Sequence, residues 1–277
     1  MSAQNQNQIH SIAITNDTNY LYEYSICTLV TRHHEYQQMM QSFVDKGFTS
    51  DKCEFLHIDN SVTTTFEAFE GYNIFLQKAK GRYIILCHQD LLIHDSNYSD
   101  LQQTINQISI KDQKWAVLGN AGGLNLKWIG THITEGKTGV VRTEPNLPLK
   151  AITLDENFII VKASANLALS NDLSGFHFYG TDLCLIANLL GFTSYIINFN
   201  LIHNSNGKKD DNFYEIERRI KYKYKEAYRP RYITTTFSRF YLSGNQIGFY
   251  FFNTAMMLFF ARQYFKFFTT KSKFWLK

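Results

Sequence analysis

The sequence predicts an α/β protein with one large domain and a helical C-terminal extension. Three observations predict this fold. Short apolar runs rich in β-branched residues alternate with helical periodicity between residues 24 and 87. Polar residues follow three of these runs in succession, and from about residue 208 the chain becomes first charged and amphipathic, then strongly apolar. Strand–helix–strand units of this kind build a doubly wound sheet with right-handed crossovers.

Three strands and two helices are expected before residue 90. They are a strand at 24–31, a helix at 32–48, a strand at 53–61, a helix at 64–81 and a strand at 82–87. The first helix carries Tyr36, Met39 and Phe43 at spacings of three and four, and Gly47 suits its C-terminus. Gly81 ends the second helix.

The rest of the domain is expected to continue the alternation less regularly. The elements are a helix at 101–112, a strand at 114–123, a loop or hairpin insertion at 124–150, a strand pair or bent strand at 150–164, a helix at 180–192 and a final strand at 193–207. The extension begins with an amphipathic helix that Pro230 stops.

Composition limits the possible classes of protein. A chain of 277 residues with 44% hydrophobic residues can bury the core of such a domain. A formal net charge of +4 gives no strong case for nucleic acid, so no such partner is expected. The four cysteines lack metal-ligand spacing. Cys27, Cys87 and Cys184 lie in apolar sequence, which favours buried thiols in a reducing compartment, as in a cytoplasmic protein. Residues 1–20 lack a signal-peptide pattern and are expected to be flexible.

A binding site is expected where the strands end. Ligands of open α/β sheets bind outside the carboxyl ends of the strands. Thr31, Asp59 and the run His88-Gln89-Asp90 all fall at such ends. The sequence lacks a Gly-x-Gly-x-x-Gly fingerprint after the first strand, a Gly-x-Ser-x-Gly elbow and a phosphate-binding loop, which argues against the corresponding chemistries.

Ordered motifs make the chain resemble the family 2 glycosyltransferases, the inverting enzymes with the GT-A fold. The motifs are the first strand with Thr31, "HIDNS", "GYNIFLQKAKGRYIILCHQD", "FHFYGTDLCLIANLLGF" and "LIHNSNG". The resemblance is greatest to a subgroup with His-Gln-Asp in place of Asp-x-Asp. It implies a Rossmann-like GT-A domain over residues 21–207, with a mixed sheet and helices on both faces, and an extension over 208–277.

The resemblance also implies roles for single residues. The nucleotide-binding set is Thr31, Asp59, Asn73, His88 and Asp90. Asp90 and His203 would bind a divalent cation, Mn²⁺ or Mg²⁺, because a diphosphate leaving group needs positive charge. Asp182 would be the catalytic base that deprotonates the acceptor. His177 and the pair Asp155-Glu156 are further candidates near the expected acceptor side.

The implied reaction moves a sugar from a nucleotide-sugar donor, expected to be a uridine diphosphate sugar, to an acceptor hydroxyl with inversion. The acceptor would be a glycan or a lipid-linked molecule in bacterial surface polysaccharide or glycolipid synthesis. Two alternatives stay open. One is a nucleotidyltransferase on a similar fold, and the other is a non-catalytic protein that binds sugar nucleotides.

The extension contains a mainly apolar stretch at residues 247–261, followed by basic and aromatic residues. As a helix it would reach roughly 22 Å at 1.5 Å per residue, short of a bilayer core of about 30 Å. Such a helix suits peripheral contact with an anionic membrane, at the inner face of the cell membrane. Packing against the catalytic domain or a second subunit is the alternative.

Overall fold

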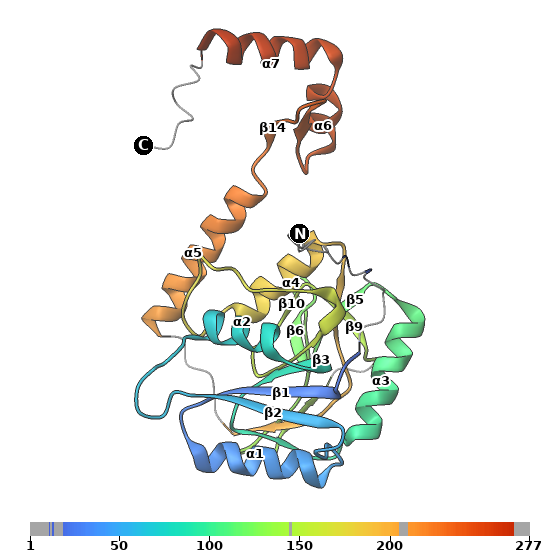
Figure 1. Cartoon of the computed structure of the whole chain (residues 1–277), viewed down its shortest axis with the longest axis vertical. Coiled ribbons are helices and arrows are strands. Elements are labelled where there is room, and N and C mark those ends of the chain that lie inside the picture. The colour runs from blue at the N-terminus through green and yellow to red at the C-terminus, as the bar shows by residue number, and fades with distance from the viewer. Residues whose placement is uncertain (1–10, 12, 14–18, 144–145, 205–209, 269–277) are drawn as a thin grey trace, which may run out of the picture. The chain divides into compact units, whose positions relative to one another are not determined.

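The computed structural model describes residues 11, 13, 19–143, 146–204 and 210–268 (Figure 1). Most of the N-terminal segment expected to be flexible lies outside these residues. The chain divides into two compact units, residues 1–209 and residues 210–277.

A mixed sheet of seven strands forms the centre of the first unit, in the order β2-β1-β3-β11-β5-β12-β9. The strands are β1 (Tyr22–Val30), β2 (Cys53–Asp59), β3 (Gly81–Cys87), β5 (Trp115–Gly119), β9 (Leu149–Ala151), β11 (Phe158–Lys162) and β12 (Thr193–Ile196). β1 runs parallel to both β2 and β3, whereas β11 is antiparallel to β3 and β5. The predicted α/β fold with a mixed sheet is confirmed.

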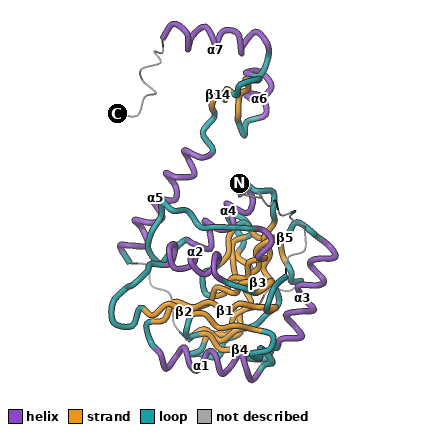
Figure 2. Tube along the Cα trace, viewed as in Figure 1, coloured by secondary structure: helices purple, strands orange, loops and turns teal. Residues whose placement is uncertain are grey.

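Helices cover both faces of this sheet (Figures 1 and 2). They are α1 (His33–Asp45), α2 (Ala68–Lys78), α3 (Tyr98–Lys111) and α4 (Tyr179–Leu189). Alternate residues of a strand point to opposite faces. Tyr83 and Ile85 of β3 accordingly join one buried cluster with side chains of α1 and α3. On the other face α2 lies over β1, and α4 lies over β5 and β12.

A second sheet, in the order β10-β6-β7-β13-β4, lies beside the first, and β8 pairs with its strand β7. Its strands are β4 (Leu91–Ile93), β6 (Ala121–Gly123), β7 (Ile129–Glu135), β8 (Val141–Thr143), β10 (Thr153–Leu154) and β13 (Leu201–His203). The segment expected to be a loop or hairpin at 124–150 thus contains the antiparallel pair β7–β8 and the strand β9. The segment at 150–164 divides into β10, β11 and part of β9.

Two predicted elements differ from the structure for identifiable reasons. The single final strand expected at 193–207 is divided into β12 and β13, which belong to different sheets. Between them Phe199 is buried and stacks on Phe158, with ring centroids 5.5 Å apart. The second helix begins at Ala68 because the side-chain oxygen of Asn60 accepts hydrogen bonds from the backbone N–H groups of Thr65 and Phe66, which holds those residues in a loop.

Cys27, Cys87 and Cys184 are buried free thiols, as predicted, and Cys53 is buried as well. In the second unit, α5 (Asp211–Ala227) precedes a hairpin, β14 (Arg231–Thr234) and β15 (Arg239–Leu242), which the sequence pattern did not predict. The apolar segment is divided into α6 (Gln246–Phe252) and α7 (Ala255–Phe268). Among the residues described, no helix has both the length and the apolar character needed to cross a bilayer.

Candidate functional site

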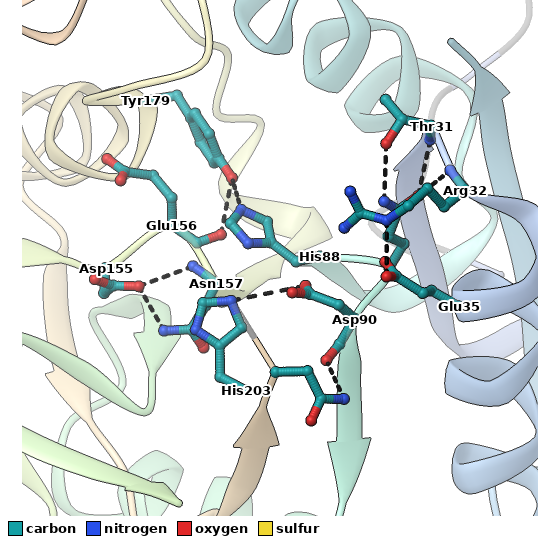
Figure 3. Close-up of polar contacts among 12 residues, drawn as sticks. Thr31, Arg32, Glu35, His88, Asp90, Asp155, Glu156, Asn157, Tyr179 and His203 are labelled. Atoms are coloured by element: carbon teal, nitrogen blue, oxygen red, sulfur yellow. Dashed lines mark hydrogen bonds and ion pairs between the residues drawn. The ribbon is translucent and has the colours of Figure 1, made fainter. Parts of the chain in front are cut away.

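Polar side chains gather beyond the ends of β1 and β3 (Figure 3). The chain leaves β3 through His88, Gln89 and Asp90 and enters β4. β4 pairs antiparallel with β13, and this register sets His203 opposite Leu91, the residue after Asp90. One ligand atom from each of His88, Asp90 and His203 lies within 4.8 Å of the other two. The fold therefore brings together three of the predicted residues.

Asp90 is held at this position by its own backbone. Its carbonyl oxygen accepts hydrogen bonds from the backbone N–H of Asn204 at 3.3 Å and from the Asn204 side-chain amide at 3.2 Å. The carboxylate is 6% exposed, and its Oδ1 lies 3.7 Å from Nε2 of His203. That distance exceeds a hydrogen bond, so the two groups approach each other without a tight contact.

The ring of His88 is fixed by Tyr179, whose hydroxyl oxygen lies 3.2 Å from Nε2. Tyr179 gives its only proton to the backbone carbonyl of Glu156 at 2.8 Å, since a carbonyl oxygen can only accept. The tyrosine oxygen then accepts from His88 Nε2–H, which leaves the lone pair on Nδ1. Burial, and next the neighbouring His203, lower the pKa of His88 and keep its ring neutral. His88 therefore offers Nδ1 as a metal ligand.

The set of donors fits a divalent cation. Asp90 supplies a carboxylate oxygen, and His88 and His203 supply imidazole nitrogens. Mg²⁺ is bound mainly by oxygen, whereas imidazole suits softer divalent ions better. Because His88 stands where the Asp-x-Asp motif has its first carboxylate, Asp90 gives the site a single negative charge. The residues therefore favour Mn²⁺ over Mg²⁺.

Gln89 connects the ends of β1 and β3, a function that sequence reasoning missed. Its Oε1 accepts from the backbone N–H of Thr31 at 2.8 Å and of Arg32 at 2.9 Å, and its Nε2 donates to Thr31 Oγ1 at 2.8 Å. The side chain is buried. An amide directly after an apolar strand was the available signal, because a buried amide must find partners.

A pocket of about 280 Å³ opens beside the cluster. Its lining residues are Leu29, Thr31, Arg32, Asn60, Ala68, Tyr72, His88, Gln89, Asp90, Phe176, His177 and Tyr179. The volume is near the lower end for small-molecule sites. Thr31, His88 and Asp90 of the predicted nucleotide set therefore share one pocket, with His177 also on its wall.

Asp59 ends β2 and is half exposed. Its Oδ1 accepts from the backbone N–H of Ser61 at 2.8 Å, which forms an Asx turn, and its Oδ2 lies 3.1 Å from Nε2 of His33. The hydrogen bonds from Ser61, followed by His33, lower the pKa of Asp59. Asp59 is thus an ionised acceptor at the edge of the sheet, while its neighbour Asn60 lines the pocket.

Asn73 lies elsewhere. Its buried amide donates to the carbonyl of Leu169 at 3.0 Å and accepts from the N–H of Leu169 at 2.7 Å. Together with Glu67, Glu70 and Ser170 it lines a separate pocket of about 430 Å³. The structure does not place Asn73 with His88 and Asp90, and the amide braces the segment around Leu169.

The structure does not support Asp182 as the catalytic base. Its side chain is 0% exposed in the first turn of α4. Oδ2 accepts from the backbone N–H of Ser170 at 2.8 Å, and Oδ1 accepts from the Ser170 hydroxyl at 2.7 Å. A base must reach the acceptor hydroxyl. Sequence alone could not distinguish a carboxylate at the open start of a helix from one that is enclosed.

Of the remaining acidic candidates, Glu156 lies beside Tyr179, and Asp155 accepts a hydrogen bond from the backbone N–H of Asn157 (Figure 3). Burial, followed by repulsion from Asp155, raises the pKa of Glu156 to about 8, although the backbone N–H groups of Phe178 and Gly180 partly oppose the shift. Glu156 is therefore mostly protonated at neutral pH. The Tyr179 hydroxyl, which also lies 3.4 Å from that of Tyr72, is a second functional group that the sequence reading missed.

A relative and several solved structures are similar to this chain, while no family model matches it. The Fuscovulum blasticum protein named "ATP synthase subunits region ORF 6" is 35% identical over 227 residues, which cover 80% of this chain and 91% of that protein.

Among solved structures, S. aureus TarS is 15% identical to this chain with a TM-score of 0.44. The match covers 73% of this chain and 40% of the TarS chain. S. aureus TarS 1–349 in complex with UDP-GlcNAc is 12% identical with a TM-score of 0.49. The match covers 91% of this chain and 77% of that chain. The Pyrobaculum calidifontis mannosyltransferase PcManGT, in complex with GDP-Man and Mn²⁺, is 9% identical with a TM-score of 0.45. The match covers 70% of this chain and 60% of that chain. These likenesses are loose, so the chemistry must follow from this chain's own residues.

Proposed function

The chain belongs to the same protein family as the ATP synthase subunits region ORF 6 protein of Fuscovulum blasticum, and we propose that it is a glycosyltransferase. In this proposal it moves a sugar from a nucleotide-sugar donor to an acceptor hydroxyl with inversion. The observation that carries the proposal is the cluster of His88, Asp90 and His203 beside the pocket at the strand ends. The ordered motifs that resemble family 2 glycosyltransferases support it.

The cluster suits the departure of a nucleoside diphosphate. A divalent cation bound there would neutralise the charge that develops on the diphosphate as the sugar leaves. Asp90 and the two histidines would hold the cation, and Tyr179 keeps His88 in the neutral tautomer that binding requires. Arg32 lines the same pocket, but Glu35 lies 2.7 Å from its guanidinium and offsets its charge. A cation held there would therefore be the main source of positive charge in the proposed site.

The donor's nucleotide would lie along the ends of β1 and β2. Thr31 lines the pocket, and Gln89 fixes the backbone on either side of it. Asp59 keeps free lone pairs on both oxygens and could accept the ring N–H of a uracil base. We assign base recognition to Asp59 and a uridine diphosphate sugar to the donor. Asn73 would act indirectly, through the segment at Leu169.

His177 is the residue to which we assign the catalytic base. An inverting transfer needs a group that takes the acceptor proton while the hydroxyl attacks the anomeric carbon. His177 shares the pocket wall with His88, Asp90 and Tyr179. Glu156 suits this task less at neutral pH, because its raised pKa of about 8 keeps it protonated. In this proposal Asp182 holds the segment at Ser170 in place and does not contact the substrate.

The acceptor is proposed to be a glycan or lipid-linked hydroxyl. The rings of Tyr72, Phe176 and Tyr179 line the pocket together with its polar residues. Aromatic faces beside a few polar groups suit the mixed apolar and hydroxylated surface of a sugar. Synthesis of bacterial surface polysaccharide or glycolipid is the setting that we propose.

The test is turnover with a donor panel. The purified full chain would be incubated with UDP-glucose, UDP-GlcNAc or GDP-mannose, with Mn²⁺, Mg²⁺ or a chelator and a sugar acceptor. We expect release of nucleoside diphosphate from a UDP sugar that depends on the cation. A bound donor at 100 times its dissociation constant should also stabilise the fold by about 2.7 kcal/mol.

Two variants make the test specific. Asp90→Asn should abolish turnover with either cation, whereas Asp45→Asn, at an exposed carboxylate on α1, should leave turnover and its dependence on the cation unchanged. Release of pyrophosphate would indicate a nucleotidyltransferase instead. Binding of a donor without turnover of any acceptor would indicate a sugar-nucleotide-binding protein. Full turnover in excess chelator would refute the role assigned to the cluster.

A further inference from the structure

The part of the second unit between Lys225 and Phe268 exposes many apolar side chains. From Lys225 to Phe268, all of which the structure describes, no residue is buried. Fifteen of the 41 residues from 228 to 268 are aromatic. A segment with so much exposed apolar surface and no core is not expected to face water alone. A partner with an apolar region should therefore cover it.

A few contacts connect the hairpin of this unit to α6. The Tyr232 and Tyr241 rings lie 4.9 Å apart, as do those of Tyr241 and Phe252, which connects the hairpin to α6. The Asn253 side chain accepts from the N–H of Tyr241 at 2.8 Å and donates to its carbonyl at 2.9 Å. Asn253, which interrupts the apolar segment in the sequence, is therefore occupied with the hairpin.

α7 presents an apolar side and a basic side. Met256, Phe260, Tyr264 and Phe267 recur at spacings of four, four and three, so they share one side of the helix. These four side chains are 60%, 56%, 59% and 73% exposed, respectively. Arg262 and Lys266 are four residues apart and share another side. The helix is thus amphipathic, with only a narrow polar side.

Charge is distributed unevenly along the chain. All 24 acidic residues precede Ala227, whereas eight of the 28 basic residues follow it. The last 51 residues therefore carry +8, and the first 226 carry −4. A second copy of the same surface would meet it with like charge, which opposes self-association. An anionic surface with an apolar interior matches both properties.

We propose that the second unit binds the interface of an anionic lipid bilayer, with α7 lying in the plane of the membrane. α7 has 14 residues, and at 1.5 Å per residue it is about 21 Å long, too short to span a core of about 30 Å. Apolar side chains would enter the boundary between headgroups and acyl chains, and basic side chains would contact the headgroups. This inference does not depend on the sugar-transfer chemistry.

The experiment is vesicle flotation with the purified full chain. Vesicles of phosphatidylcholine alone are compared with vesicles that contain 30% phosphatidylglycerol. We expect flotation with the anionic vesicles only, and its loss in 1 M salt, where the screening length falls to about 3 Å. Arg262→Glu with Lys266→Glu should weaken binding at least about tenfold. Phe260→Ser with Phe267→Ser should weaken it by a similar factor.

Matched controls lie in the first unit. Lys111→Glu with Lys114→Glu makes the same change in charge, and Leu126→Ser removes an exposed apolar side chain there. Both should float like the parent. A parent chain that ignores anionic vesicles would overturn the proposal, as would flotation that neither C-terminal pair weakens. Light scattering gives the alternative outcome. If the parent chain does not bind vesicles but forms a dimer, and the two serine substitutions dissociate that dimer, then the surface binds a second copy of the chain.

Discussion

Replacement of Asp182 separates a structural carboxylate from a catalytic one. In the structure its two oxygens accept the N–H and the hydroxyl of Ser170, and the side chain is fully buried. Asp182→Ala removes both hydrogen bonds and leaves two polar groups of the buried Ser170 without these partners. Hydrogen bonds to a charged group contribute about 1.5–3 kcal/mol each. We therefore expect the free energy of unfolding to fall by about 3–6 kcal/mol, a large part of a typical total of about 5–15 kcal/mol.

Asp182→Asn tests the same contact more gently. The amide oxygen can still accept from the Ser170 N–H, and the serine hydroxyl can turn to accept from the new amide N–H. The expected loss is about 1 kcal/mol, with sugar transfer within tenfold of the parent. Ser170→Ala removes one of the two bonds and should give a loss between those of the two Asp182 variants. Asp45→Ala, at an exposed position on α1, should cost less than about 0.5 kcal/mol.

The assay is urea unfolding followed by far-UV circular dichroism, with turnover measured on the same preparations. One pattern of results would contradict a purely structural role for Asp182. If Asp182→Ala unfolds within about 1 kcal/mol of the parent, and Asp182→Asn lowers turnover by about 10² to 10⁴-fold, the carboxylate is a general base after all. The buried geometry would then have to open during catalysis.

Three further predictions concern the site. Tyr179→Phe removes the acceptor of His88 Nε2–H, and Mn²⁺ affinity measured by electron paramagnetic resonance should fall about 10 to 100-fold while the fold is retained. Gln89→Leu loses three hydrogen bonds that join β1 to β3 and should lower the free energy of unfolding by about 2–4 kcal/mol in urea; a loss below about 1 kcal/mol would contradict the bracing role. Glu156 binds its proton more tightly in the folded state than in the unfolded chain. This contribution to the free energy of unfolding is complete below pH 4.5 and is lost as the pH rises through about 8. The melting temperature of the parent should therefore fall between pH 6 and pH 9, and Glu156→Gln should flatten that fall.

Local sequence patterns were enough to predict β1, β2 and β3 and the helices between them. β1, β2 and β3 are short apolar runs, and α1 shows its buried stripe as Tyr36, Met39 and Phe43. Periodicity of this kind records which side of a local element is buried, so it can be read within about ten residues. The positions of Thr31, Asp59 and Asp90 at strand ends followed from the same pattern.

Which of these residues contact one another depends on how distant segments pack together. His203 reaches Asp90 through the pairing of β13 with β4, between segments more than 100 positions apart, and no local pattern encodes that register. Asp90 comes three positions after a buried strand and Asp182 two positions after Gly180, yet Asp182 is enclosed by Ser170 while Asp90 joins two histidines. Burial and partners of a polar side chain depend on what the fold packs over it, and that is a property of distant segments rather than of its neighbours in sequence.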